Sequence, residues 1–384
     1  MASIAQSKLD SMYETPPRYT PFDSRDRTLH SAGSDPDPIR PRIAKEAEHA
    51  AEEVAAPTSD PQTMSLPPSF VERGEVLCAE EMTTRYTDAE WEEIFREVEA
   101  EVEAWLAKEG KGQGGGKKKR VVDLGEVAGR IDHTLLKLDA KGMQIDELCS
   151  EARRHGFASV CVRPAWVQQC TSNLQNTRNP HIKTAAVIAF HEGTQDLSSS
   201  ILEIRSALEA GADEFDIVLN HALLTSSPSS SPNDKFAQIY NHLASLRQQA
   251  PEPKILKLIL ETSQLTRSQI VAAATLAAAA SYDFIKTSTG FNGAGATVEN
   301  VRLMSACCEV LAKRNGGGKK MHVKASGGIR TLGDAVEMLE AGAERLGSSG
   351  GVGIAKEARE KGKGEGGDGG ESIVGGATRL ETDY

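Results

Sequence analysis

Two lysines occupy the same uncommon position in two separate stretches of the sequence, close to the end of a short apolar run. Lys286 follows residues 282–285 and precedes small hydroxyl residues and a glycine, and Lys324 lies in the similar stretch 321–328. A lysine is costly to place in an apolar setting, so it needs a partner or a function there. An uncharged lysine amine is a nucleophile that forms a Schiff base with a carbonyl compound. For an isolated lysine, the alternative is a side chain that extends from a strand end into solvent.

The presence of two such lysines favours the chemical interpretation. If the two stretches are neighbouring strands, the ammonium groups lie close together, and each disfavours protonation of the other, as burial also does. The pKa of one amine then falls towards neutrality, which gives an uncharged nucleophile at physiological pH. We assign Lys286 as the nucleophile and Lys324 as its electrostatic neighbour, although the spacing alone leaves the reverse assignment open.

The elements that would position these lysines follow from an alternation of short apolar runs and amphipathic stretches between residues 121 and 358. The expected strands are 130–136, 159–163, 183–190, 214–220, 255–261, 283–287, 322–325 and 345–347. The expected helices include 145–155, 198–210, 234–249, 268–280, 298–314 and 332–341. This repetition predicts an α/β fold of the (β/α)8 TIM-barrel type. A doubly wound open sheet is the alternative, but it has fewer strands and a glycine-rich turn after the first one.

In such a barrel, the carboxyl ends of the strands face one shared mouth. The polar side chains expected there are Asp132, Thr134, Cys161, His191, Glu192, Asp216, Asn220, Glu261, Lys286 and Lys324. Asp216 lies in the middle of an apolar strand, where it either forms an ion pair with a lysine or acts as an acid–base group. Asp132 presents the same two alternatives. The set lacks the ligand spacing of a zinc site, so we expect no metal there.

Glycine and serine residues follow the last two expected strands. Gly327 and Gly328 come after the seventh strand, and Gly347, Ser348 and Ser349 come at the end of the eighth. Many barrels bind phosphate with the loops after these two strands. Glycine lets the backbone approach the phosphate oxygens, and serine hydroxyls donate hydrogen bonds. The sequence therefore predicts a phosphate site at this part of the mouth.

Composition narrows the class of protein further. The formal net charge of −11 disfavours a general nucleic-acid binder, which needs a basic face. The six cysteines show no CxxC spacing, so we expect free thiols and a reducing compartment. We expect neither a membrane span nor a secretory signal, because the required apolar runs are missing from the sequence. A cytoplasmic protein is the resulting expectation.

The chain outside the barrel divides into three segments. Residues 1–86 are rich in proline, serine and acidic residues, and we expect them to be a disordered extension. Residues 87–120 predict an amphipathic helix, which Thr87 and Glu90 cap, and then a Gly/Lys linker. This helix packs either on the barrel or on a partner. Residues 359–384 form an expected flexible, glycine-rich tail, whose terminal Tyr384 is either inert or folds back to the mouth.

Five motifs together resemble the deoxyribose-phosphate aldolase family. They lie at residues 131–137, 160–164, 211–218, 286–291 and 323–331. The resemblance implies a class I aldolase without metal or organic cofactor that reversibly cleaves 2-deoxy-D-ribose 5-phosphate to D-glyceraldehyde 3-phosphate and acetaldehyde. It implies that Lys286 forms the Schiff base, that Lys324 perturbs it, and that Asp216 moves protons through a water. It also implies a homodimer or a higher homo-oligomer. The expected substrate-binding residues are Asp132, Thr134, Cys161, Thr289, Gly327, Gly328, Gly347, Ser348 and Ser349, although Cys161 could serve packing alone.

The sequence departs from the family pattern at two positions of the mouth. The third strand ends with His191 where the family usually has proline, so substrate fit or pH response could differ. Phe291 stands where some members have a lysine, which removes one possible phosphate contact. Two other functions remain open at this point. One is a transaldolase-like Schiff-base aldolase acting on a different phosphosugar, and the other is a catalytically silent sugar-phosphate-binding scaffold.

Overall fold

The structure is a computed structural model that describes residues 68–72, 75–78, 86–110, 120–175, 182–226 and 234–365. Within these ranges, no helix is long and apolar enough to cross a membrane. The expectations for the rest of residues 1–86, for residues 111–119 and for residues 366–384, including Tyr384, lie outside the described residues.

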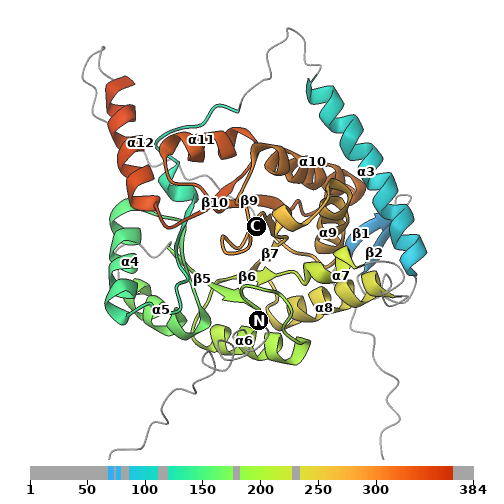
Figure 1. Cartoon of the computed structure of the whole chain (residues 1–384), viewed down its shortest axis with the longest axis horizontal. Helices are drawn as coiled ribbons and strands as arrows, with labels where there is room; N and C mark the ends of the chain where they lie inside the picture. Colours follow the sequence, from blue (N-terminus) through green and yellow to red (C-terminus); the bar gives the residue numbers. More distant parts are fainter. Residues whose placement is uncertain are drawn as a thin grey trace, which may run out of the picture. The chain divides into compact units, whose positions relative to one another are not determined.

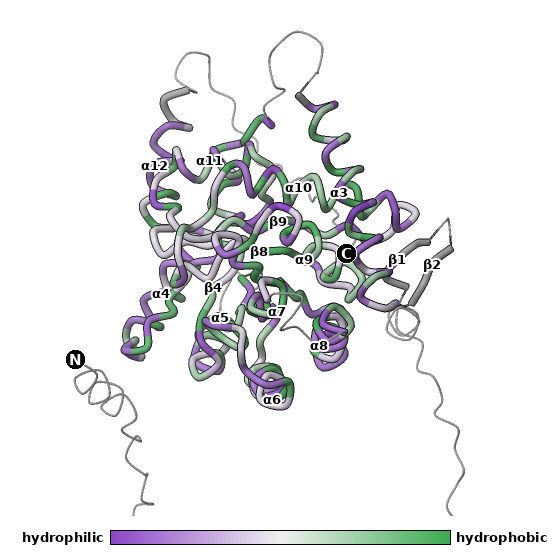
Figure 2. Tube along the Cα trace, turned by 45° about the vertical axis from the view of Figure 1, so that its right-hand side comes forward, coloured by the Kyte–Doolittle hydropathy of each residue, from purple (hydrophilic) through white to green (hydrophobic). Residues whose placement is uncertain are grey.

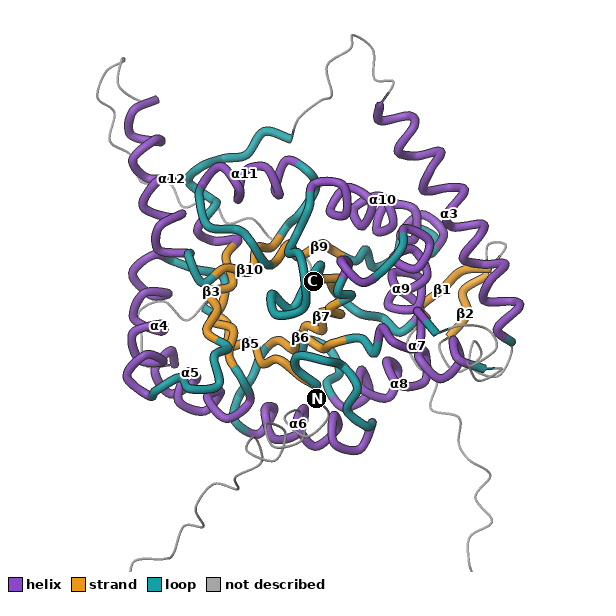
Figure 3. The backbone as a smooth tube through the Cα atoms, viewed as in Figure 1, coloured by secondary structure: helices purple, strands orange, loops and turns teal. Residues whose placement is uncertain are grey.

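Eight parallel strands form a closed barrel in the order β10-β3-β4-β5-β6-β7-β8-β9 (Figure 1). They are β3 (Ile131–Leu135), β4 (Ser159–Val162), β5 (Lys183–Ile188), β6 (Glu214–Val218), β7 (Ile255–Ile259), β8 (Phe284–Lys286), β9 (His322–Ser326) and β10 (Arg345–Ser348). Figure 3 shows these strands as an orange ring inside a layer of purple helices. The prediction of a (β/α)8 barrel is therefore confirmed.

The helices of this layer alternate with the strands along the chain. They are α4 (Gly142–His155), α5 (Val167–Gln175), α6 (Leu197–Glu209), α7 (His221–Thr225), α8 (Lys235–Gln249), α9 (Arg267–Ala279), α10 (Val298–Arg314), α11 (Leu332–Glu340) and α12 (Gly351–Glu365). Side-chain caps fix several beginnings: Asp196, Thr266, Thr297 and Thr331 each accept a hydrogen bond from a backbone N–H of the first turn. Figure 2 shows hydrophobic colour around β8, where the barrel meets its helices.

Some boundaries differ from the sequence-based expectation. The expected strand 183–190 is two residues longer than β5, because Ala189 has a φ of 53° and leaves the extended conformation. Helix α12 runs to Glu365, so the boundary expected after residue 358 falls inside a helix. Within the segment expected to be disordered, β1 (Pro68–Glu72) and β2 (Glu75–Cys78) form an antiparallel pair.

A further helix, α3 (Asp88–Gly110), covers the outer side of α8, α9 and α10. It begins where the capping box places it, because the carboxylate of Glu90 accepts hydrogen bonds from both the backbone N–H and the hydroxyl of Thr87. Its buried face presents Trp91, whose ring centroid lies 5.9 Å from that of Tyr240 on α8. Asp88 in turn accepts hydrogen bonds from the first two backbone N–H groups of α8. Helix α3 therefore packs on the barrel.

Candidate active site

Seven charged side chains form one connected set inside the barrel, which we call the charged column. Its members are Asp132, Glu214, Asp216, Lys257, Lys286, Lys324 and Arg345. They point inward because alternate residues of a strand face the same side, as Glu214 and Asp216 of β6 do. Lys286 and Lys324 are register partners on the adjacent strands β8 and β9.

Asp216 lies at the centre of the charged column. Its Oδ2 accepts hydrogen bonds from the Nζ atoms of both Lys286 and Lys324, each at 2.7 Å. Its Oδ1 accepts a third hydrogen bond, also 2.7 Å long, from Nζ of Lys257. Because the first two amines share one oxygen, their nitrogens cannot be further apart than twice that distance. The structure therefore brings together the three residues to which the sequence assigns catalysis.

Three members of the charged column were not predicted from the sequence: Lys257, Glu214 and Arg345, which we call its lower part. Lys257, which is fully buried, lies 2.6 Å from Glu214, and Lys324 forms a second ion pair with Asp132. Arg345 begins β10 and donates hydrogen bonds to Asp132 at 2.6 Å and to Glu214 at 3.2 Å. Asp132 and Lys324 were expected at the mouth, whereas Lys257 lies inside its strand and Glu214 and Arg345 begin theirs, away from the strand ends where functional residues were expected. The signal that could have found Lys257 was a single lysine inside the apolar run of β7.

The two lysines that share Asp216 have opposite pKa shifts. Burial is the largest influence on Lys286 and lowers its pKa; the Lys324 ammonium adds to this effect, while Asp216 opposes it, and the pKa ends below its ordinary value. Burial also lowers the pKa of Lys324, but attraction to Asp132 and Asp216 outweighs burial, so that pKa is raised. Lys286 is therefore the amine that loses its proton more easily.

Two carboxylates of the charged column, Asp216 and Asp132, stay ionised for the complementary reason. Burial would raise the pKa of Asp216, but Lys257, Lys286 and Lys324 together hold it well below its ordinary value. The pKa of Asp132 is lowered in the same way, against burial, by Arg345, Lys324 and Lys257. With every member ionised, the column holds four positive and three negative charges. Release of one proton from one lysine leaves it neutral.

Three other predicted residues, Cys161, Thr134 and Thr289, lie near the charged column or the end of β7. Cys161 Sγ lies 3.9 Å from Asp216 Oδ2, and burial followed by the nearby Asp216 raises the thiol pKa to about 11, so it remains protonated. The hydroxyl of Thr134 donates to the backbone oxygen of Asp132. The backbone N–H and hydroxyl of Thr289 both donate to the carboxylate of Glu261, which holds Glu261 at the end of β7.

The predicted phosphate-binding residues lie together at the ends of β9 and β10. Gly327 and Gly328 have φ values of 84° and 81°, which glycine adopts at little cost. Gly347 is the register partner of Ser326 on β9. The hydroxyl of Ser348 already donates to the backbone oxygen of Ile329 and accepts from Gly350, so its proton is not available to a ligand in this arrangement. Ser349 is exposed and lies two residues before α12.

His191 and Phe291, the two residues that depart from the family pattern, contact each other at the mouth. The ring of His191, from the loop after β5, stacks on Phe291, from the loop after β8, with centroids 5.3 Å apart and planes 13° apart. Phe190 packs edge-on against the same phenyl ring. Asn292 adds a hydrogen bond to the backbone oxygen of His191. The loop after β8 therefore reaches across the mouth to the loop after β5.

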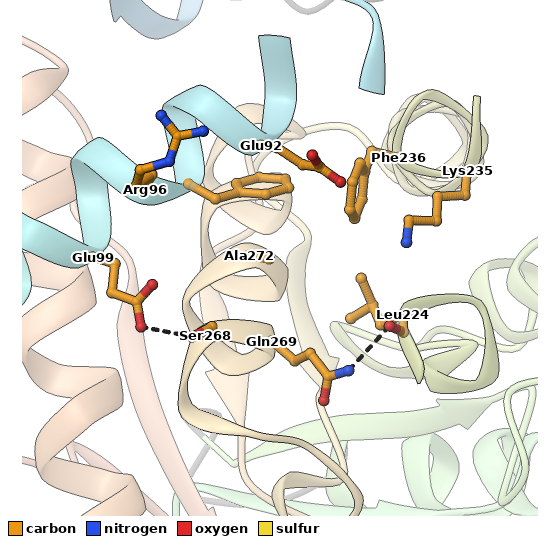
Figure 4. A pocket seen from close by; sticks show the side chains of 10 residues that line it. Glu92, Arg96, Glu99, Leu224, Lys235, Phe236, Ser268, Gln269 and Ala272 are labelled. Carbon is orange, nitrogen blue, oxygen red and sulfur yellow. Dashed lines mark hydrogen bonds between the residues drawn. The ribbon is translucent and has the colours of Figure 1, made fainter. Parts of the chain in front are cut away.

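A cavity of about 380 Å³ lies outside the barrel, between α3 and the helices α7, α8 and α9. Figure 4 shows Arg96 and Glu99 of α3 on one side of it, and Lys235 and Gln269 on the barrel side. Glu99 accepts a hydrogen bond from the hydroxyl of Ser268 across this space. The cavity therefore marks the seam between α3 and the barrel, away from the strand ends.

The fold and the buried lysine–aspartate centre define a barrel enzyme whose chemistry can run through a primary amine. The sequence model of the DeoC/LacD family aldolases matches residues 127–357. The chain belongs to this family of aldolases, and it is therefore an enzyme of the lyase class. This agrees with the family resemblance of the five sequence motifs.

Individual relatives agree with this assignment. The deoxyribose-phosphate aldolase of Coccidioides immitis (strain RS) is 46% identical over 239 residues, which are 62% of this chain and 82% of that protein. Its counterpart in Streptococcus pneumoniae serotype 19F is 42% identical over 226 residues, covering 59% and 94%. Among solved structures, a Coccidioides immitis protein provisionally assigned the same activity has a TM-score of 0.59 at 40% identity, covering 69% and 98%. The tetrameric deoxyribose phosphate aldolase of Aeropyrum pernix has a TM-score of 0.53 at 29% identity, covering 63% and 94%.

Proposed function

We propose that this aldolase reversibly cleaves 2-deoxy-D-ribose 5-phosphate to D-glyceraldehyde 3-phosphate and acetaldehyde through a Schiff base on Lys286. The observation that carries the proposal is the arrangement of Lys286 and Lys324 on one oxygen of Asp216, in which the pKa of Lys286 alone is lowered. The activity of the similar fungal and bacterial proteins supports the choice of substrate.

The reaction begins when uncharged Lys286 attacks the C1 aldehyde of the open-chain sugar. Loss of water from the adduct gives an iminium ion, whose positive nitrogen accepts the electron pair of the C2–C3 bond. Asp216, acting through a water, removes the proton of the C3 hydroxyl, and D-glyceraldehyde 3-phosphate leaves as that bond breaks. The remaining enamine takes a proton on carbon, and hydrolysis releases acetaldehyde and regenerates Lys286.

Lys324 has two roles in this scheme. As an ammonium group it keeps the pKa of Lys286 low, and it holds Asp216 in position through the shared oxygen. Its raised pKa keeps it protonated through the cycle, which suits a group that stabilises charge without itself attacking the substrate. The opposite pKa shifts favour Lys286 as the nucleophile. The spacing in the sequence had left open the reverse assignment, in which Lys324 attacks the substrate.

The substrate phosphate would bind at the loops after β9 and β10. The backbone N–H groups of Gly327 and Gly328, the exposed Ser349 and the first turn of α12 are the proposed donors. Ser348 and Gly347 would shape this loop, and Thr134, Cys161, Thr289 and Asp132 would line the path from the phosphate to Lys286. We also propose a homo-oligomer, which is supported by the tetrameric relative from Aeropyrum pernix.

Reduction with borohydride in the presence of acetaldehyde tests the nucleophile, because it converts the Schiff base into a stable amine. Wild-type protein should gain the mass of one ethyl group, and peptide mapping should place that group on Lys286. Lys286→Ala should lose both trapping and turnover. Trapping of Lys286→Ala at full stoichiometry would show that another lysine is the nucleophile.

The products test the substrate. Incubation with 2-deoxy-D-ribose 5-phosphate should release acetaldehyde in the same molar amount as D-glyceraldehyde 3-phosphate. A protein that is trapped by borohydride but releases no acetaldehyde would be an aldolase of another phosphosugar, such as a transaldolase-like enzyme. A protein that binds the sugar phosphate without trapping or turnover would be a silent scaffold.

A further inference from the structure

The charged column connects Lys286 with a residue two strands away. Lys286 is the last residue of β8 and Arg345 is the first residue of β10, and Lys324 on the intervening strand β9 is the register partner of both. Hydrogen bonds and ion pairs connect them: Lys286 bonds to Asp216, Asp216 to Lys324, Lys324 to Asp132, and Asp132 to Arg345. A second branch runs from Asp216 through Lys257 and Glu214 to the same arginine.

Solvent contributes little to the charge balance of this column. The side chains of Asp132, Asp216, Lys257 and Lys324 have no exposed surface, and that of Arg345 is 14% exposed. Charges removed from water must be balanced by partners close by, because water cannot screen them. The protonation state of each member therefore depends on all the others.

Three of the four cations hold their protons firmly. The pKa of Arg345 is raised by Asp132 and Glu214, which outweigh burial. The pKa of Lys257 is raised by Asp216, Glu214 and Asp132, again against burial. With Lys324, these cations match the three carboxylates of the column one for one. Lys286 is the fourth cation of the set. It shares Asp216 with Lys257 and Lys324, whose pKa values are raised.

We infer that Arg345 is a positioning residue for the proposed aldolase reaction, which it assists through the ion pairs of the charged column. By occupying Asp132 and Glu214, Arg345 leaves Lys257 and Lys324 to balance Asp216, so Lys286 becomes the cation in excess. The inference rests on the proposed function of Lys286. It assigns to Arg345 and Glu214, whose ion pairs are with other members of the charged column, a measurable influence on the chemistry of Lys286.

Other titratable groups near Lys286 leave this count unchanged. The thiol of Cys161 is protonated, because burial and Asp216 raise its pKa to about 11. The carboxylate of Glu261 faces Thr289, from which it accepts two hydrogen bonds. Among the described residues, the charged groups that form ion pairs within the column are therefore its own seven members, and Cys161 and the ring of Phe284, over which Arg345 lies, are uncharged contacts.

Substitutions of Arg345 and of Glu214 should shift the pKa of Lys286 in opposite directions. Arg345→Met removes a positive charge, so Lys286 should keep its proton to higher pH. Glu214→Gln removes a negative charge, so Lys286 should lose its proton at lower pH. Each substitution should shift the midpoint of the trapping rate against pH by about one pH unit. Below the midpoint, this is a tenfold change in trapping rate at a given pH. The double variant restores the count, and its midpoint should return towards that of the wild type.

The measurement is the rate of borohydride trapping with acetaldehyde as a function of pH, for the wild type, both single variants, the double variant and Arg345→Lys. Arg345→Lys keeps the charge and should retain the wild-type midpoint. Thermal unfolding monitored by circular dichroism identifies variants that do not fold. If Arg345→Met does not fold, the midpoints of Glu214→Gln and Arg345→Lys decide the question.

A purely structural role would lower trapping in both single variants without separating their midpoints, and this result would overturn the inference. Midpoints that move in the same direction would also overturn it. Failure of the proposed function looks different, because the wild-type protein itself would then not be trapped at any pH.

Discussion

Replacing Lys324 with methionine tests how strongly one ammonium group controls another in this barrel. The substitution removes a charge whose nitrogen shares an oxygen of Asp216 with Lys286 at 2.7 Å. Methionine fills a similar volume, and Asp132 keeps Arg345 and Lys257 as counter-ions, so it stays ionised. The principal change is therefore the loss of one positive charge beside the proposed nucleophile.

The size of the effect follows from the geometry. Two unit charges about 5 Å apart in a medium with an effective dielectric constant of about 20 interact by about 3 kcal/mol. One pKa unit corresponds to 1.36 kcal/mol, so the pKa of Lys286 should rise by about 2 units. Asp216, freed from one of its lysines, would interact more strongly with Lys286 and shift the pKa in the same direction.

The rate of borohydride trapping with acetaldehyde, measured across a range of pH, reports this shift directly. Each unit of pKa lowers the uncharged fraction of Lys286 tenfold below the midpoint, so trapping at neutral pH should fall about 100-fold. Full stoichiometry should return at high pH. Cys161→Ala is the matched control: it changes an uncharged neighbour of the same Asp216 oxygen, so its midpoint should stay at the wild-type value.

A Lys324→Met protein whose trapping profile coincides with that of the wild type would refute this reasoning. It would mean that burial alone sets the pKa of Lys286. A profile shifted to lower pH would be a stronger contradiction, because it would require Lys324 to stabilise the protonated form of its neighbour.

Two further predictions concern the phosphate loop and helix α3. Gly327→Ala should raise the KM for 2-deoxy-D-ribose 5-phosphate, because a Cβ at this φ of +84° would lie 2.9 Å from the Cα of Gly295. Trapping with acetaldehyde, which carries no phosphate, should change little. An unchanged KM would show that this loop does not bind the phosphate. Trp91→Ala should lower the free energy of unfolding by about 3–5 kcal/mol, because a fully buried indole between Phe95 and Tyr240 is lost. Urea denaturation measures this change, and a loss below about 1 kcal/mol would mean that α3 contributes little to the stability of the barrel.

The fold was predictable because a parallel barrel repeats one local pattern. Apolar runs and amphipathic helices alternate along the sequence, and each unit can be recognised without knowing its neighbours. Lys286 and Lys324 were predictable as a pair for the same reason, since both lie in similar strands that follow one another. The end of β5 was not, because Ala189 is apolar, and hydrophobicity does not reveal the positive φ that ends the strand.

The lower part of the charged column was beyond this reasoning. Asp132 and Arg345 are far apart in the sequence, and they meet because β10 closes the barrel onto β3. Functional residues of a barrel are expected at the carboxyl ends of its strands, whereas Glu214 and Arg345 begin theirs, so their positions in the sequence did not single them out. The hydroxyl of Ser348 donates its proton to the backbone oxygen of Ile329, a contact that forms only in the folded loop and could not be read from the sequence.

The close approach of Gly295 to Gly327 constrains how the mouth can open. A Cβ on Gly295 would lie 2.2 Å from the backbone oxygen of Gly327, and the N–H of Ala296 bonds to the backbone oxygens of Ser326 and Gly327. The segments that follow the two lysine-bearing strands are thus joined main chain to main chain, so a displacement of one would displace the other. Phe190 and His191 of the loop after β5 contact this pair through the ring of Phe291 and one hydrogen bond from Asn292.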